Sequence, residues 1–235
     1  MAVTIAENVA VIRERIVAAC KRSQRSPGDV QLMAVSKTKP VEMIRGAYEA
    51  GITVFGENYV QEFADKLPVI SGLRIEWHLI GHLQSNKAAL AAELFDALDV
   101  IDSLKLAERL NRAALDLGKM LDVLLEINIG GEESKSGIAP GSPELNELLR
   151  GFDRLQALQL RGLMCIPLIT ENPDDSRPYF RRLRELRDEL AALHLPRVEL
   201  DELSMGMTHD FEIAIEEGST CVRVGTGIFG EREPR

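Results

Sequence analysis

The chain is poor in the residues that mark several protein classes. Aromatic residues make up only 5% of its 235 residues, and its three cysteines, which are far apart, form no CxxC pair. An odd number of scattered cysteines excludes a disulfide framework and is typical of the reducing cytoplasm, where we expect the protein to work. The four histidines have no HExxH or comparable spacing, so we expect no structural metal.

Excess positive charge and long apolar runs are lacking as well. The formal net charge is -9 at pH 7, whereas nucleic-acid binding depends on clustered lysine and arginine. No apolar run approaches the ~20 residues that a bilayer span requires. Apolar residues recur at helical spacing from Ile5 to Ala19, which predicts an amphipathic helix rather than a signal peptide. We therefore expect neither a nucleic acid nor a membrane as partner.

Short apolar segments alternate with helical patterns along the remainder of the chain. The segments are β-branched or rich in leucine, as strands buried on both faces are. We predict strands at 31–37, 52–57, 75–81, 97–102, 120–128, 160–166, 199–204 and 220–225. Helical patterns lie between them, at about 40–50, 58–70, 84–93, 103–117, 143–157, 175–193 and 208–217.

This alternation implies an α/β fold in which right-handed crossovers join parallel strands. Eight such units in a chain of this length predict a (β/α)8 TIM barrel with one extra N-terminal helix. An open doubly wound sheet is the alternative, and it is disfavoured because eight is a natural closure number. No linker rich in Ser, Gly or Pro interrupts the pattern, so we predict a single domain over residues 1–235.

Several polar residues fall where the predicted strands end, which is where the chemistry of such barrels gathers. Lys37 closes the first strand, and a lysine amine desolvated there can become a nucleophile that forms a Schiff base. Gly225 and Thr226 follow the last strand, and Ser204 to Gly206 follow the seventh; their backbone N–H groups suit a phosphate. A reactive amine beside a phosphate cradle suggests pyridoxal phosphate.

Other polar residues of these strands have two interpretations. Arg223 lies within the last strand, and arginine is almost never buried alone, so it pairs with a buried carboxylate or faces a ligand. Glu76 and His78 alternate with apolar residues and could form a polar network without any ligand. Asn58 begins a predicted helix, where polar residues usually act as caps.

The segment from Gly225 to Gly230 spells GxGxxG, which is also the fingerprint of dinucleotide-binding domains. That fingerprint opens a helix and is followed about 20 residues later by an acidic residue. Here only five residues follow Gly230. The context therefore argues against a dinucleotide, whereas a phosphate held at a tight turn remains compatible with it.

Motifs along nearly the whole chain closely resemble those of the pyridoxal phosphate homeostasis proteins. They occur in the family's order, and members of that family are single-domain barrels similar to the N-terminal domain of alanine racemase. The matching segments are Ala34 to Pro40, Phe55 to Glu62, His78 to Lys87, Ser134 to Gly137, Arg161 to Met164, Leu203 to Met207 and Gly218 to Gly230.

The resemblance implies a single barrel domain that holds pyridoxal 5'-phosphate (PLP) as a Schiff base on Lys37. By the same match, Ser204, Gly225 and Thr226 are similar to phosphate contacts. Arg223 is similar to the residue that faces the pyridine nitrogen, and Asn58 to a side chain that lines the site.

Two further positions bear on this resemblance. Gly227 departs from the pattern, because we expect alanine there in many members, and the change should loosen the turn without removing a contact. Lys135 lies in a polar loop and could meet an anionic molecule at the rim of the barrel.

The resemblance implies a protein that carries or buffers PLP, maintains intracellular PLP and amino-acid and keto-acid pools, and is not an enzyme. An arginine beside the pyridine nitrogen disfavours protonation of the ring and weakens it as an electron sink. We expect a monomer, with apo PLP-dependent enzymes as candidate recipients. A PLP-dependent amino-acid racemase is the first alternative, although the racemases carry a second β-rich domain. A cofactor-free Schiff-base aldolase acting through Lys37 is the second alternative.

Overall fold

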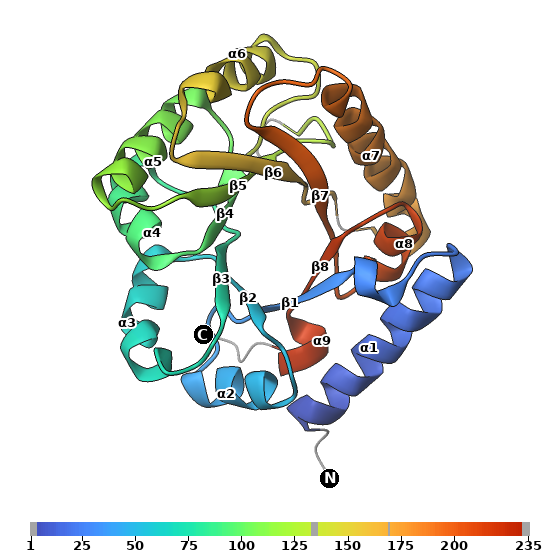
Figure 1. The fold of residues 1–235 in the computed structure, drawn as a ribbon. Helices are drawn as coiled ribbons and strands as arrows, with labels where there is room; N and C mark the ends of the chain where they lie inside the picture. The colour runs from blue at the N-terminus through green and yellow to red at the C-terminus, as the bar shows by residue number, and fades with distance from the viewer. Residues whose placement is uncertain (1–3, 133–135, 169, 232–235) are drawn as a thin grey trace.

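The computed structural model describes residues 4–132, 136–168 and 170–231. Eight parallel strands close a barrel in chain order, so that the last strand pairs with the first (Figure 1). The strands are β1 (Gln31–Val35), β2 (Val54–Glu57), β3 (Glu76–Leu79), β4 (Ala97–Ile101), β5 (Leu121–Glu126), β6 (Leu158–Met164), β7 (Val198–Met207) and β8 (Cys221–Val224). The prediction of a (β/α)8 barrel is confirmed, and the open doubly wound sheet is excluded.

Helices cover the outside of the barrel, as Figure 1 shows. They are α2 (Val41–Glu49), α3 (Val60–Ile70), α4 (Ala88–Leu94), α5 (Leu104–Asp116), α6 (Pro143–Gly151), α7 (Arg177–Ala191) and α8 (Phe211–Glu216), and a short α9 (Thr226–Phe229) follows β8. The strands contribute buried residues to both the interior and the helix-facing side, as in β4, where all five residues are buried.

The extra N-terminal helix, α1 (Ile5–Arg22), is also confirmed. A capping box starts it, because the Thr4 hydroxyl accepts a hydrogen bond from the Glu7 backbone N–H while the Glu7 side chain accepts one from the Thr4 N–H. Val9, Ile12 and Ile16 are buried against the barrel. The helix packs beside α8 and α9, so the first helix lies against the last two helices (Figure 1).

Several predicted boundaries are wrong, and that of β7 bears most on the site. Strand β7 continues to Met207, three residues beyond the predicted end, because Gly206 adopts a positive φ of 92° at a shift in register between β7 and β8. A side chain at Gly206 would meet Ala214 and Phe211 of α8, so only glycine fits this irregular strand. The helix predicted at 143–157 ends at Gly151, and α9 was not predicted at all.

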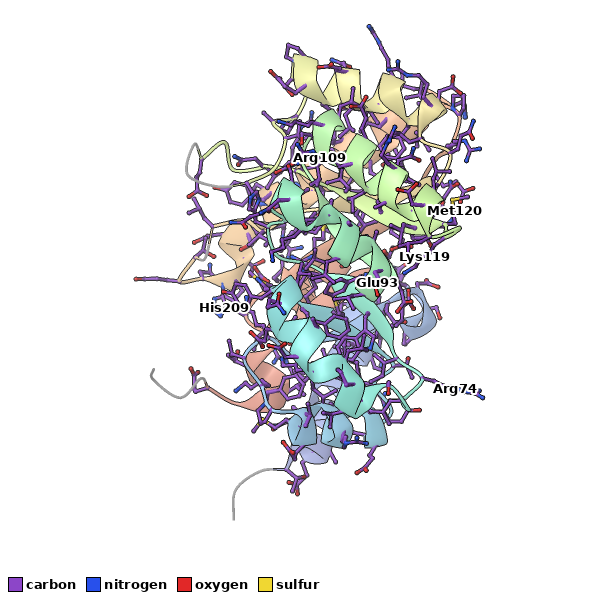
Figure 2. The ribbon with its side chains drawn as sticks, turned by 90° about the vertical axis from the view of Figure 1, so that its left-hand side faces the viewer. Arg74, Glu93, Arg109, Lys119, Met120 and His209 are labelled. Atoms are coloured by element: carbon purple, nitrogen blue, oxygen red, sulfur yellow. The ribbon has the colours of Figure 1, made fainter. Side chains whose placement is uncertain are left out.

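The residues before the strands and those after them lie at opposite ends of the barrel. In the side view of Figure 2, Arg74, Lys119 and Met120, which precede strands, appear at one end, and His209, which follows β7, appears at the other. We call the second end the rim. Within the described ranges no helix has the length and apolarity for a membrane span, and no cluster of side chains suited to a metal ion occurs there.

Candidate functional site

Lys37 lies at the rim, directly after β1 and between the ends of β2 and β8. The Ser36 N–H donates a hydrogen bond to the Gly56 carbonyl of β2 (3.0 Å). On the other side Gly225 packs against Val35, and a Cβ at Gly225 would lie 3.6 Å from the Val35 Cβ. Pairing of β1 with both strands therefore brings Lys37, which is partly buried, to the place where both strands end.

A buried ion pair supports the backbone beside Lys37. Glu57, which ends β2, is fully buried and accepts hydrogen bonds from the Ser36 hydroxyl (2.8 Å) and the Lys66 ammonium (2.8 Å). Lys66, on α3, also donates to the Ser36 carbonyl (3.0 Å). Burial raises the pKa of Glu57, and the charge and hydrogen bond of Lys66 oppose that rise. The residue before Lys37 is thus held through both its side chain and its carbonyl.

Asn58 follows Glu57, and its side-chain oxygen, Oδ1, is buried without a hydrogen-bond partner among the residues that the structure describes. The expectation that Asn58 is a helix cap is wrong, because the N-cap position of α3 is Tyr59 and no side chain caps it. The backbone of Gly81 packs closely against Asn58, since a Cβ at Gly81 would lie 2.5 Å from the Asn58 carbonyl oxygen. Buried polar atoms almost always have partners, so the unpaired oxygen indicates a place for a ligand group.

The other side of the rim is a turn of small residues. Gly225 is the N-cap of α9, and Thr226 is its exposed first residue. The Gly227 N–H donates to the Thr208 hydroxyl (3.3 Å), which joins this turn to the end of β7. Thr208 was missed by the sequence analysis because β7 was predicted to end at Ser204. The first turn of a helix has N–H groups without intrahelical partners, which suits an anion.

The absence of a side chain at Gly227 avoids close contacts with neighbouring residues. A Cβ there would lie 3.0 Å from Val224 and 3.1 Å from the methyl group of Thr208, both tighter than ordinary contacts. An alanine would therefore crowd Thr208 across the turn. Glycine, where the family pattern leads us to expect alanine, leaves space beside the Thr208 methyl group.

Lys39 joins the loop after β1 to the end of α9. Its ammonium donates to the carbonyl oxygens of Phe229 (3.3 Å), Gly230 (3.2 Å) and Glu231 (3.1 Å). A positive charge at a helix C-terminus is favourable. The loop that carries Lys37 and the turn that carries Thr226 are consequently held together by a direct contact.

Ser204 and Arg223 lie deeper than the rim and contact each other. The Arg223 guanidinium is 3% exposed and donates to the Ser204 hydroxyl (2.7 Å) and to the backbone carbonyl of Cys165 (2.8 Å). Ser204 in turn donates to Asp99 on β4 (3.4 Å). Arg223 thus reaches the buried carboxylate of Asp99 through the Ser204 hydroxyl, and it lies just below the turn at Gly225.

The polar chain continues from Asp99 across the barrel. The second oxygen of Asp99 pairs with His78 Nδ1 (2.9 Å), and His78 Nε2 pairs with Glu76 (3.2 Å), whose side chain is 57% exposed. Burial lowers the pKa of His78, but the charges and hydrogen bonds of Asp99 and Glu76 outweigh it and raise the pKa to about 10. Glu76, His78, Asp99 and Arg223 therefore carry alternating charges. The interior network expected from Glu76 and His78 exists, whereas Asp99 was missed.

Another buried carboxyl group lies at the end of β5. Glu126 is 6% exposed and accepts a hydrogen bond from the Ser136 hydroxyl (2.9 Å). Burial raises the pKa of Glu126, against the opposing effects of Ser136 and the charge of Arg223. The rim thus contains a carboxyl group that takes up a proton more readily than an exposed one. Lys135, by contrast, lies outside the described residues.

The predicted site residues fall into two groups. Lys37, Asn58, Gly225 and Thr226 meet at the rim, on the ends of the three neighbouring strands β8, β1 and β2. Arg223 and Ser204 lie below them in the interior. An amine, an unpaired amide oxygen, a glycine-rich helix start and a guanidinium fit the functional groups of PLP, which are an aldehyde, polar ring substituents, a phosphate and a ring nitrogen.

Comparison with known proteins places this chain in a known family. Residues 5–233 match the family model of the alanine racemase N-terminal domain. The pyridoxal phosphate homeostasis protein of Aquifex aeolicus is 46% identical over 227 residues, which are 97% of this chain and 98% of that one. Its counterpart in Haemophilus influenzae is 47% identical over 230 residues (97% and 96%). The chain belongs to the pyridoxal phosphate homeostasis protein family, as its motifs had indicated.

Solved structures agree with this placement. PipY of Synechococcus elongatus PCC7942, in a structure with PLP bound, is 41% identical with a TM-score of 0.82, over 97% of this chain and 100% of that one. Alanine racemase from Streptomyces coelicolor is 19% identical with a TM-score of 0.73, over 95% of this chain and 58% of that one. The racemase likeness concerns the fold alone, and it covers little more than half of the racemase.

Proposed function

We propose that the protein binds PLP and carries or buffers it, and thereby maintains intracellular PLP and the pools of amino and keto acids. The observation that carries this proposal is the meeting of Lys37 with the glycine-rich start of α9 on the paired strands β1 and β8. The membership of the family and the PLP bound to PipY support it.

Each rim residue has a role in this proposal. Lys37 holds the cofactor covalently as a Schiff base, and Asn58 offers its unpaired oxygen to a polar group of the ring. The backbone N–H groups of Gly225 and Thr226 bind the phosphate, with the hydroxyl of Thr208 beside them. When bound, PLP supplies a reactive aldehyde and a pyridine ring, which is an electron sink when it is protonated.

Arg223 favours a carrier over an enzyme. Its guanidinium is permanently charged, and Asp99 and His78 beneath it complete an alternating chain of charges. A fixed positive charge facing the ring nitrogen disfavours protonation of that nitrogen, so the ring would support carbanion chemistry poorly. We therefore propose that the protein is not an enzyme, with weak amino-acid racemase activity as the alternative.

Location and assembly follow as further proposals. The cysteines within the described ranges, Cys20, Cys165 and Cys221, are buried and free, which suits a reducing compartment. We place the protein in the cytoplasm as a monomer of one barrel domain. Apo forms of PLP-dependent enzymes are the partners that a carrier would serve.

The absorption spectrum tests the proposal. The protein, mixed with PLP and freed of excess, should show a visible band that borohydride bleaches. Lys37→Ala should lack the band, and Lys105→Ala, which changes an exposed lysine on α5, should keep it. A protein that stays colourless after addition of PLP would contradict the cofactor and favour the aldolase. A racemase assay on the loaded protein then separates carrier from enzyme.

A further inference from the structure

We infer that Ser204 and Asp99 are positioning residues, which hold the guanidinium of Arg223 in the orientation that it presents to the cofactor ring. This inference rests on the proposed function, because it takes Arg223 to face the ring. It assigns Ser204 a role different from the phosphate contact predicted from the sequence, and it adds Asp99, which the motifs did not indicate.

Two contacts fix the guanidinium of Arg223. Nη1 donates to the Ser204 hydroxyl on β7 and Nη2 to the Cys165 carbonyl at the end of β6, at 2.7 and 2.8 Å. Because a guanidinium is planar, anchoring two of its nitrogens fixes both its plane and its rotation. The Cys165 anchor is a backbone atom, so Ser204 is the side chain that determines the orientation.

Asp99 orients the Ser204 hydroxyl so that its oxygen accepts a hydrogen bond from Arg223. A hydroxyl has one hydrogen to donate and lone pairs to accept with. Ser204 gives its hydrogen to Asp99 (3.4 Å), which leaves its lone pairs for Arg223. Asp99 is 1% exposed, and a buried carboxylate is costly unless it is paired. His78 provides that pairing from the opposite side, at 2.9 Å.

The depth of Ser204 separates this role from direct contact with a phosphate. Strand β7 runs three residues further, to Met207, and Thr208 rather than Ser204 contacts the turn at Gly227. Ser204 is fully buried, and its side-chain hydrogen bonds with Asp99 and Arg223 point to interior groups. It therefore acts on the cofactor through Arg223.

A double-mutant cycle on the full-length protein tests this. The variants are Ser204→Ala, Arg223→Gln and the two combined, with Asp99→Asn as an independent change at the next link. Asp99→Asn keeps the shape of the side chain and removes the carboxylate behind Ser204, while His78 keeps its contact with Glu76. The readouts are the position of the visible band of bound PLP and the dissociation constant for PLP.

Ser219 provides a matched control. It is an equally buried serine, and its hydroxyl contacts the carbonyl oxygens of Leu203, Met205 and Cys221, between the same two strands but away from Arg223. Ser219→Ala therefore reports the effect of losing a buried hydroxyl alone. Far-UV circular dichroism and urea unfolding of every variant identify those that fail to fold.

We expect Ser204→Ala and Asp99→Asn each to shift the band in the same direction as Arg223→Gln. Each should weaken PLP binding about tenfold, the loss typical of one hydrogen bond to a charged group. Ser204→Ala should add little in the Arg223→Gln background. Ser219→Ala should keep the original band and affinity.

Two results would overturn the inference while the proposed function stands. In one, Ser204→Ala and Asp99→Asn leave band and affinity unchanged. In the other, the effects of Ser204→Ala and Arg223→Gln simply add, which would mean that Ser204 contacts the cofactor directly. Failure of the proposed function is a different result, namely a wild-type protein that shows no Lys37-dependent band.

Discussion

Removal of Lys66 should destabilise the protein strongly, because it leaves the carboxyl group of Glu57 without its cation. Glu57 is fully buried and the Lys66 side chain is 11% exposed. Replacement by methionine keeps most of the volume and removes the charge. Breaking one side of a buried ion pair typically costs 3–5 kcal/mol, so we expect Lys66→Met to lower the free energy of unfolding by about 3 kcal/mol at pH 8.

The loss should depend on pH in a defined direction. Burial raises the pKa of Glu57 in the folded protein, and Lys66 opposes that rise. Without Lys66 the folded pKa rises further above its unfolded value, so the folded variant holds a proton that the unfolded chain releases. Its stability must then fall as the pH rises above the unfolded pKa of about 4.3, until the folded pKa is passed. Urea unfolding should therefore show a smaller loss at pH 5 than at pH 8.

Two further variants complete this experiment. Glu57→Gln in the Lys66→Met background removes the unpaired charge and should recover much of the lost stability. Arg182→Met breaks an ion pair with Glu189 whose side chains are 42% and 56% exposed, and such pairs are worth about 1 kcal/mol or less. A Lys66→Met variant that loses no more than Arg182→Met, equally at both pH values, would refute the reasoning.

Three other changes have defined outcomes. Gly81→Ala places a Cβ 2.5 Å from the Asn58 carbonyl oxygen, so urea unfolding should show a loss of about 2 kcal/mol and PLP titration a weaker complex. Burial opposes ionisation of Glu217, but hydrogen bonds from Arg181 and Arg177 lower its pKa overall. The ionised Glu217 therefore stabilises the fold above its unfolded pKa, and this stabilisation is lost as the pH falls through the folded pKa. Glu217→Gln should therefore flatten the acid limb of a plot of unfolding free energy against pH. Thr4→Ala removes the cap of α1 and should cost about 1 kcal/mol in urea unfolding.

The sequence allowed the fold to be predicted because its signals are local. All eight strands appear where apolar segments of suitable length occur, and their number and alternation with helices determine a closed barrel. The end of β7 was placed wrongly because Gly206 resembles a loop residue. In the structure it extends the strand through a positive φ that packing against α8 supports. Such support comes from tertiary contacts that a local pattern does not contain.

The positions of the candidate site residues were predictable for the same reason. Lys37, Gly225 and Thr226 were expected at one rim because each follows a strand, and the structure places them there. The pairing of Ser204 with Asp99 was not, because it joins residues 105 positions apart on β7 and β4, across the interior rather than between neighbouring strands. An aspartate inside the apolar segment 97–101 was the available signal, but it does not specify the partner.

The pairing of β1 with β8 has a consequence for how the protein is made. A ribosome delivers Lys37 long before Arg223, Gly225 and Thr226, and β1 lacks one of its two neighbours until β8 arrives. A nascent chain that has reached only β7 thus displays the amine without the turn that suits a phosphate. The newly made protein acquires its complete site only when almost all of the chain described by the structure has been translated.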